Sequence, residues 1–209
     1  MGRKWPLSDI CNSVSQRRAA SPRCSTVCCP VAWPLTIKAC ASLALSYDNA
    51  KLAHALIVSG HATGQSAVLQ RGLDALRWLT ELQMSEKGHF RPIGSNGFYR
   101  RGGPRADFDQ QPIEAQAMVS ACLEAYRATS DIWWYEHAQR AFDWFLGWND
   151  LGLELYSPES GACGDGLHVD RVNGNQGAES TLAFLLSLAE MRLAQNMVTS
   201  FREPIAIGA

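Results

Sequence analysis

The chain has 209 residues and a formal net charge of −1, and charged residues make up 19% of it. This length is sufficient for one domain with a substantial core. The near-neutral charge argues against nucleic acid or an anionic membrane surface as a partner. A membrane-spanning helix needs about 18 or more apolar residues in a row. The longest candidate is interrupted by Glu179, Ser180 and Glu190, so we expect no membrane span.

Residues 1–40 lack the regular spacing of the rest of the chain. Four prolines interrupt any helical pattern, and five of the seven cysteines lie here. Cys24, Cys28 and Cys29 have no downstream Cys or His pair at zinc-site spacing, and the apolar stretch 31–45 does not fit a signal peptide. We expect an irregular or disordered extension, or a non-native stretch, on a cytoplasmic protein with reduced thiols, no metal and no cofactor.

A helical pattern begins near Ser46. Leu52, Ala55 and Leu56 share one face of a first predicted helix, which ends at Gly60. The further predicted elements are a turn over 61–65, a helix over 67–83, a Gly-rich loop over 88–109, helices over 111–128 and 132–148, a second long loop over 149–174, a helix over 176–196, and a tail over 197–209.

Three acidic residues, Asp48, Glu114 and Glu179, stand 66 and then 65 residues apart, and each opens an apolar helical stretch. A shift of the chain by 66 residues also aligns segment 75–79 with segment 141–145. A fixed period with a helical hairpin in each copy is typical of repeat architectures. We therefore predict an all-α fold, a partial α/α toroid of helical hairpins with a period of about 66.

The predicted domain, residues 45–196, holds two complete hairpins and half of a third. A closed toroid of six such hairpins would need about 350 to 400 residues. Three arrangements therefore stay open: a part of a larger toroid, an assembly with another copy, and an open arc whose exposed apolar edge favours self-association. In each, the short turns lie on one side and the long loops on the other, and long loops in a compact domain are usually functional.

The long loops combine aromatic rings, carboxylates, amides and histidines. Sugar sites need this mixture, because aromatic faces pack on the C–H side of a pyranose while carboxylate and amide groups contact its vicinal hydroxyls. A histidine in a loop also often bonds only to the backbone, and we keep that alternative. The predicted substrate-binding residues are His89, Asn96, Tyr99, Gln111, His168, Asn175 and Gln176.

Cleavage of a glycosidic bond needs one carboxylic acid that protonates the leaving oxygen and one carboxylate that attacks or activates water. Glu114 and Glu179 begin neighbouring predicted helices, so we expect them to face one cavity, with Asp109 and Asp165 just before them in the loops. These four are the predicted catalytic residues. A structural role competes with this one, because an acid in the first turn of a helix stabilises the helix dipole by about 0.3–1 kcal/mol.

Three segments of the chain resemble a bacterial α/α-toroid family described as glycosyltransferases or glycosidase-like proteins. The helical domain of this family is similar to the six-hairpin glycosidases and the N-acylglucosamine 2-epimerases. The resemblance implies a role in carbohydrate metabolism, by glycoside hydrolysis or glycosyl transfer on a sugar or glycan in a groove lined by the long loops. Its alternatives are a non-catalytic glycan-binding or accessory module of a partner glycosyltransferase, and an inactive fragment of a larger toroid. The segments are His89-Phe90-Arg91-Pro92-Ile93-Gly94, Asp109-Gln110-Gln111-Pro112-Ile113-Glu114-Ala115 and Asn175-Gln176-Gly177-Ala178-Glu179-Ser180.

Overall fold

The computed structural model describes residues 44–202, with side chains described through Asn196, so the predicted extension at 1–40 lies outside the described residues. The described part of the chain is largely helical, as predicted. No helix in it is both long and apolar enough to cross a membrane. Its helices are α3 (Lys51–Ala62), α4 (Ser66–Leu82), α5 (Pro112–Thr129), α6 (Ile132–Asp143) and α7 (Ala178–Arg202).

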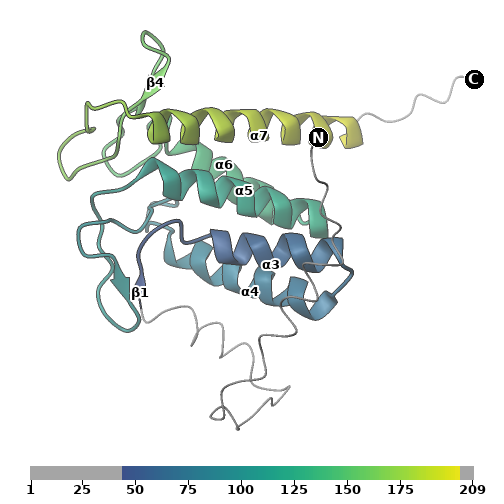
Figure 1. Ribbon diagram of the computed structural model, residues 1–209. Helices are drawn as coiled ribbons and strands as arrows, with labels where there is room; N and C mark the ends of the chain where they lie inside the picture. Colours follow the sequence, from purple (N-terminus) through teal and green to yellow (C-terminus); the bar gives the residue numbers. More distant parts are fainter. Residues whose placement is uncertain (1–43, 203–209) are drawn as a thin grey trace, which may run out of the picture. The chain divides into compact units, whose positions relative to one another are not determined.

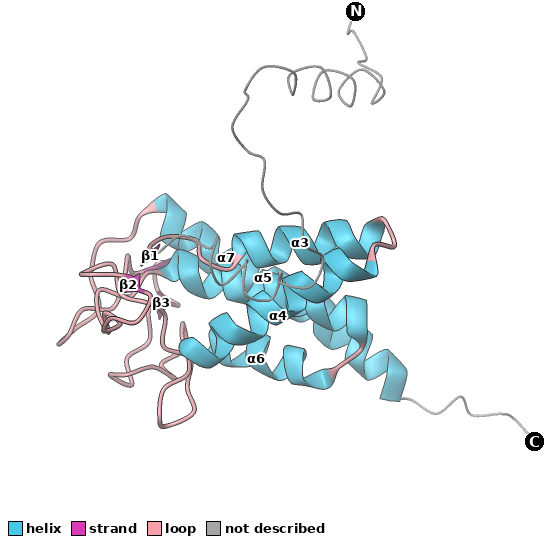
Figure 2. Ribbon diagram, turned by 90° about the horizontal axis from the view of Figure 1, so that it is seen from below, coloured by secondary structure: helices cyan, strands magenta, loops and turns pink. Residues whose placement is uncertain are grey.

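The helices lie in two layers (Figure 1). Helices α3, α5 and α7 pack side by side, with α5 in the middle. Helices α4 and α6 form the second layer, each paired with the helix that precedes it, as Figure 2 shows from below. Helix α5 contacts α3, α6 and α7, and residues 114–123 are all buried as a result. The long connections gather at one end of the bundle and the short turns at the other.

The first hairpin is held together by a close approach of its two helices. Gly72 of α4 faces α3, and a Cβ added there would lie 2.8 Å from both the backbone nitrogen and Cγ1 of Ile57. Gly60 of α3 meets the backbone of Leu69 in the same way. Because contacts this short leave no room for a side chain, glycine at these two positions sets the distance between α3 and α4.

The turn between α5 and α6 is short because both of its residues have the required backbone geometry. Ser130 adopts the left-handed conformation, with φ +57°, and its N–H donates to the carbonyl of Tyr126. Asp131 then caps α6, since its Oδ1 accepts a hydrogen bond from the backbone N–H of Trp133 at 3.0 Å. The second hairpin therefore closes within two residues.

Two helix ends differ from the prediction by more than two residues. Helix α6 ends at Asp143 rather than at 148, because the N–H groups of Leu146 and Trp148 both donate to the Asp143 carbonyl and Gly147 adopts φ +96°. Helix α7 continues through Arg202 rather than ending at 196, so the predicted tail at 197–209 begins later. The chain has no Gly or Pro between Ala178 and Glu203 to end that helix earlier.

The loop end of the bundle contains two small antiparallel strand pairs that the prediction of an all-α fold did not include. Strand β1 (Ala44–Leu45) pairs with β2 (Tyr99–Arg100), and β3 (Tyr156–Ser157) pairs with β4 (Ala162–Cys163). The loops also bond to each other, since Gln110 and Leu167 exchange backbone hydrogen bonds of 2.9 and 3.0 Å. These contacts order the loop end of the bundle.

Candidate functional site

A turn before α3 joins the first turns of α5 and α7. The hydroxyl of Tyr47 donates to Oε2 of Glu179 at 2.8 Å. Two residues later, the backbone N–H and the side-chain amide of Asn49 donate to Oε2 of Glu114, at 3.2 and 3.0 Å. Asp48 lies between them in the left-handed conformation, with φ +50°. The three acidic residues that the repeat spacing predicts, Asp48, Glu114 and Glu179, therefore meet at the loop end, and we call them the carboxylate cluster.

Glu114 is the buried member of the carboxylate cluster, with a relative exposure of 2%. Burial raises the pKa of its carboxyl group to about 7, and the hydrogen bonds from Asn49 and the nearby backbone N–H of Asp48 only partly oppose this. The charge of Asp48 raises the pKa further. Its second oxygen, Oε1, accepts no hydrogen bond from any group in the described part of the chain. Near neutral pH this carboxyl group is thus divided between its protonated and ionised forms.

The carboxylate of Asp48 resembles that of Glu114 in its burial and hydrogen bonding. Its Oδ1 is also buried and without a hydrogen-bond partner among residues 44–202. Burial raises the pKa of Asp48, and the charge of Glu179 adds to the shift, while Lys51 and His54 lower it. The cluster therefore contains two buried carboxylate oxygens that no donor satisfies, which is an uncommon arrangement in a folded protein.

Glu179 is the exposed member of the carboxylate cluster. Its hydrogen bond raises the pKa of the Tyr47 phenol to about 12, and partial burial and the charges of Glu179, Asp48 and Glu114 contribute to the same shift. One phenol thus senses all three carboxylates.

Asp109 and His168, predicted separately, are brought together by the pairing of the two long loops. Nδ1 of His168 lies 2.5 Å from Oδ1 of Asp109, and both side chains are partly exposed. The contact engages Nδ1 and leaves Nε2 as the second polar atom of the imidazole ring. An imidazole held this way by a carboxylate is oriented for proton exchange or for hydrogen bonding to a ligand.

Asp165 caps the beginning of α7. It accepts hydrogen bonds from the backbone N–H of Gly177, at 2.7 Å, and from the side-chain amide of Asn175. A hydrogen bond from the Ser180 hydroxyl lowers the pKa of its carboxyl group. Burial opposes this shift, and the hydrogen bonds from Gly177 and Asn175 add to it. This predicted catalytic residue thus holds the helix on which Glu179 stands.

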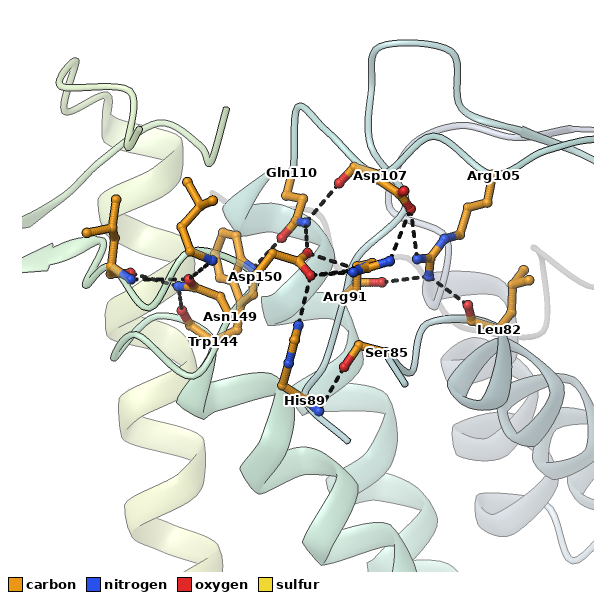
Figure 3. Close-up of polar contacts among 12 residues, drawn as sticks. Leu82, Ser85, His89, Arg91, Arg105, Asp107, Gln110, Trp144, Asn149 and Asp150 are labelled. Atoms are coloured by element: carbon orange, nitrogen blue, oxygen red, sulfur yellow. Dashed lines mark hydrogen bonds and ion pairs between the residues drawn. The ribbon is translucent and has the colours of Figure 1, made fainter. Parts of the chain in front are cut away.

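His89 lies in a buried network around Asp150 (Figure 3). Its Nε2 is 3.0 Å from Oδ1 of Asp150, and its relative exposure is 4%. Arg91 contacts the same carboxylate through Nε and Nη2, at 2.8 and 2.6 Å, and Gln110 donates to it at 2.6 Å. Trp144 in turn donates to Gln110 at 2.7 Å. The structure places His89 in this network, which ties the first long loop to the end of α6.

Sequence reasoning did not identify Asp150 as a functional or structural residue. Burial favours its protonated form, but hydrogen bonds from Arg91, Gln110 and His89 outweigh that effect and lower its pKa. A buried ion pair of this kind orders the chain around it. In the sequence, Asp150 is an aspartate that directly follows the turn after a helix. This pattern is too common to distinguish it from other aspartates.

The other predicted substrate-binding residues are spread over the loop end. Tyr99 is partly buried in β2, and Gln111 is the residue immediately before α5. Asn175 is bonded to Asp165 as described above. Asn96 and Gln176 are exposed.

The described residues were also compared with the requirements of a metal site and of a reactive thiol. No group of three or more His, Cys, Asp or Glu side chains there is placed to hold a metal ion. Cys122 and Cys163 are buried free thiols, and burial raises the pKa of each to about 12.

Comparison with protein-family models and with curated proteins finds no match.

Proposed function

We propose that this protein is a carbohydrate-active domain that hydrolyses or transfers a glycosidic bond at the carboxylate cluster. The observation that carries the proposal is the buried carboxyl group of Glu114, with a pKa of about 7, next to the acidic side chains of Asp48 and Glu179. A carboxylic acid that keeps its proton near neutral pH, beside a carboxylate that does not, is the pair that glycoside cleavage requires.

The roles follow from exposure. Glu114 supplies the proton, through the oxygen Oε1 that has no hydrogen-bond partner among the described residues. Glu179, which is exposed, attacks the sugar or activates water. His168, oriented by Asp109, binds a sugar hydroxyl through Nε2.

The two helical layers fit the same proposal as part of an α/α toroid, with α3, α5 and α7 as inner helices and α4 and α6 as outer helices. The buried free thiols agree with a cytoplasmic setting.

Oε1 of Glu114 is buried in this structure, so a substrate reaches it only if the surrounding chain moves. The turn at 47–49, which contacts Glu114 through Asn49, is the segment that we propose to move. On the α7 side this turn is held by the hydrogen bond between Tyr47 and Glu179, two exposed residues. An exposed hydrogen bond of this kind contributes only about 0.5–1.5 kcal/mol. Opening of the turn also breaks the two hydrogen bonds from Asn49 to Glu114, and it exposes the proton donor and frees Glu179 in one step.

A second candidate function is a glycan-binding or accessory module without catalysis, which acts beside a glycosyltransferase. The low exposure of Glu114, 2%, favours it. In this case Glu114 and Asp165 only hold the helix starts, and the exposed residues of the loop end contact the glycan. A panel of chromogenic glycosides and a glycan array separate the two functions, since the module binds glycans and cleaves none.

The decisive variants are Glu114→Gln and Glu179→Gln, with Glu124→Gln as the matched control on α5. We expect each of the first two to reduce turnover of a cleaved glycoside at least 100-fold, the usual size of an acid or base contribution (about 10² to 10⁴). The control keeps full turnover. Thermal unfolding of all three should remain cooperative. Full turnover in Glu114→Gln would exclude Glu114 as the acid and leave the binding module as the better explanation.

A further inference from the structure

The carboxylate cluster contains more hydrogen-bond acceptors than donors. Oε1 of Glu114 and Oδ1 of Asp48 are both buried and lack a donor among residues 44–202. The neighbouring donors are engaged elsewhere: Asn49 bonds to the other oxygen of Glu114, and Tyr47 bonds to Glu179. Lys51 is 3.5 Å from the side-chain oxygen of Gln116. Two buried acceptor oxygens of this kind call for a ligand that brings several donors.

The charge balance of the cluster points to the same kind of ligand. Three acidic groups lie close enough together to act on one phenol, that of Tyr47. The basic groups that act on Asp48 are Lys51 and His54. Burial, and then the charge of Lys51, lower the pKa of His54, so the imidazole is neutral near pH 7. Of these two groups, Lys51 carries the positive charge beside the three acids, and an added positive charge is favourable here.

We propose that the carboxylate cluster binds a primary ammonium group, with Oε1 of Glu114 and Oδ1 of Asp48 as two of its acceptors. An ammonium group carries three donors and one positive charge, which is what the cluster lacks. If the proposed carbohydrate function holds, the ligand is an amino sugar with a free amine, such as glucosamine, and it competes with the cleaved substrate because its ammonium group occupies the oxygen through which Glu114 would donate its proton. A neutral sugar would leave the charge uncompensated, and an acidic sugar would add to it.

Binding of the ammonium group changes the proton content of the site. A cation beside Glu114 favours its ionised form, so the carboxyl group releases its proton when the ligand binds. With a pKa of about 7 in the free protein, close to half a proton per site leaves at pH 7. The groups that face the cluster and shape this coupling are Tyr47 and Asp48 from the turn, Lys51 and His54 from α3, and Glu179 from α7.

Titration calorimetry of the full chain tests the proposal, in phosphate rather than Tris, which is itself a primary amine. The probes are glucosamine, glucose, N-acetylglucosamine and ethanolamine. We expect glucosamine to bind at least 10-fold more tightly than glucose and N-acetylglucosamine, which lack the ammonium charge. Mixing in weakly buffered solution at pH 7 should release protons. Asp48→Asn and Glu114→Gln should each weaken glucosamine binding at least 10-fold, while Glu124→Gln leaves it unchanged.

The outcomes separate this inference from the proposed function. Equal affinity for glucose and glucosamine overturns the ammonium site and leaves the carbohydrate function standing. Binding of ethanolamine as tight as that of glucosamine supports the ammonium site and argues against a sugar ligand. Absence of binding by either amine overturns the inference. So does glucosamine binding that both cluster variants retain, since the amine would then lie elsewhere. Circular dichroism of the two variants checks that both are folded, and either one alone suffices for the comparison.

Discussion

Asn49 and Glu114 are joined by two hydrogen bonds to a single carboxylate oxygen, across 65 residues of chain. This arrangement satisfies Oε2 fully and leaves Oε1 without a partner in the described part of the chain. It also fixes the start of α3 to the first turn of α5. The same pair of bonds therefore serves the fold and defines the atom available for chemistry.

The raised pKa of Glu114 predicts that stability depends on pH. Because the folded protein holds this proton more tightly than the unfolded chain, with a pKa of about 7 against 4.5, the stabilisation is complete below pH 4.5 and is lost as pH rises through 7. The total effect is at most about 3 kcal/mol. Urea unfolding of wild type and Glu114→Gln should be measured between about pH 4.5 and 8. The free energy of unfolding should decline less with rising pH in the variant than in wild type. Parallel curves would contradict the assignment.

Asp150 is expected to be the most sensitive carboxylate for stability. Asp150→Asn removes the charge that Arg91 and His89 face, and the side chains of Asp150 and His89 are only 8% and 5% exposed. Breaking a buried ion pair from one side costs about 3–5 kcal/mol. Asp107→Asn is the matched control, since Asp107 also contacts Arg91 but is 52% exposed, and surface pairs contribute about 0–1 kcal/mol. Denaturant unfolding measures the free energy of unfolding of both variants. Similar losses in Asp150→Asn and Asp107→Asn would show that the network around Asp150 does not order the loop.

Gly72→Ala should destabilise the protein even though alanine forms helices better than glycine. The added Cβ would lie 2.8 Å from the backbone nitrogen of Ile57, which cannot move independently of α3. Overpacking of this kind costs about 1–3 kcal/mol, against a gain of about 1 kcal/mol in helix propensity. Gly174→Ala, where nothing lies within 4 Å of the added Cβ, serves as the control. A melting temperature of Gly72→Ala at or above that of wild type would disprove the close approach.

Self-association through α7 is expected from its exposed apolar face. Leu182, Leu186 and Leu193 are 57%, 51% and 62% exposed and recur at helical spacing. The double variant Leu182→Lys/Leu186→Lys should therefore reduce the mass measured by light scattering to that of a monomer. Val169→Lys, a change at an exposed loop residue, should leave the mass unchanged. A monomeric wild type at high concentration would rule this surface out as a contact between copies.

Sequence periodicity predicted the presence and order of all five described helices, because apolar spacing at 3.6 residues per turn is a local property. It placed the end of α6 wrongly, since the effect of Gly147 depends on its backbone angle rather than on its presence alone. It singled out Asp48, Glu114 and Glu179 by spacing, and gave no sign of Asp150. The partners of Asp150, Arg91 and His89, are 59 and 61 residues away in the chain.

By itself, the sequence determined a helical chain with long loops at one end and an acidic residue at the start of successive hairpins. Only the tertiary structure decided that Glu114 is buried while Glu179 is exposed, although the two have equivalent places in the sequence. The difference arises because α5 is enclosed by three helices and by the turn at 47–49, whereas α7 lies at the side of its layer. Burial depends on neighbours far away in the chain, and burial is what shifts a carboxyl group toward proton transfer.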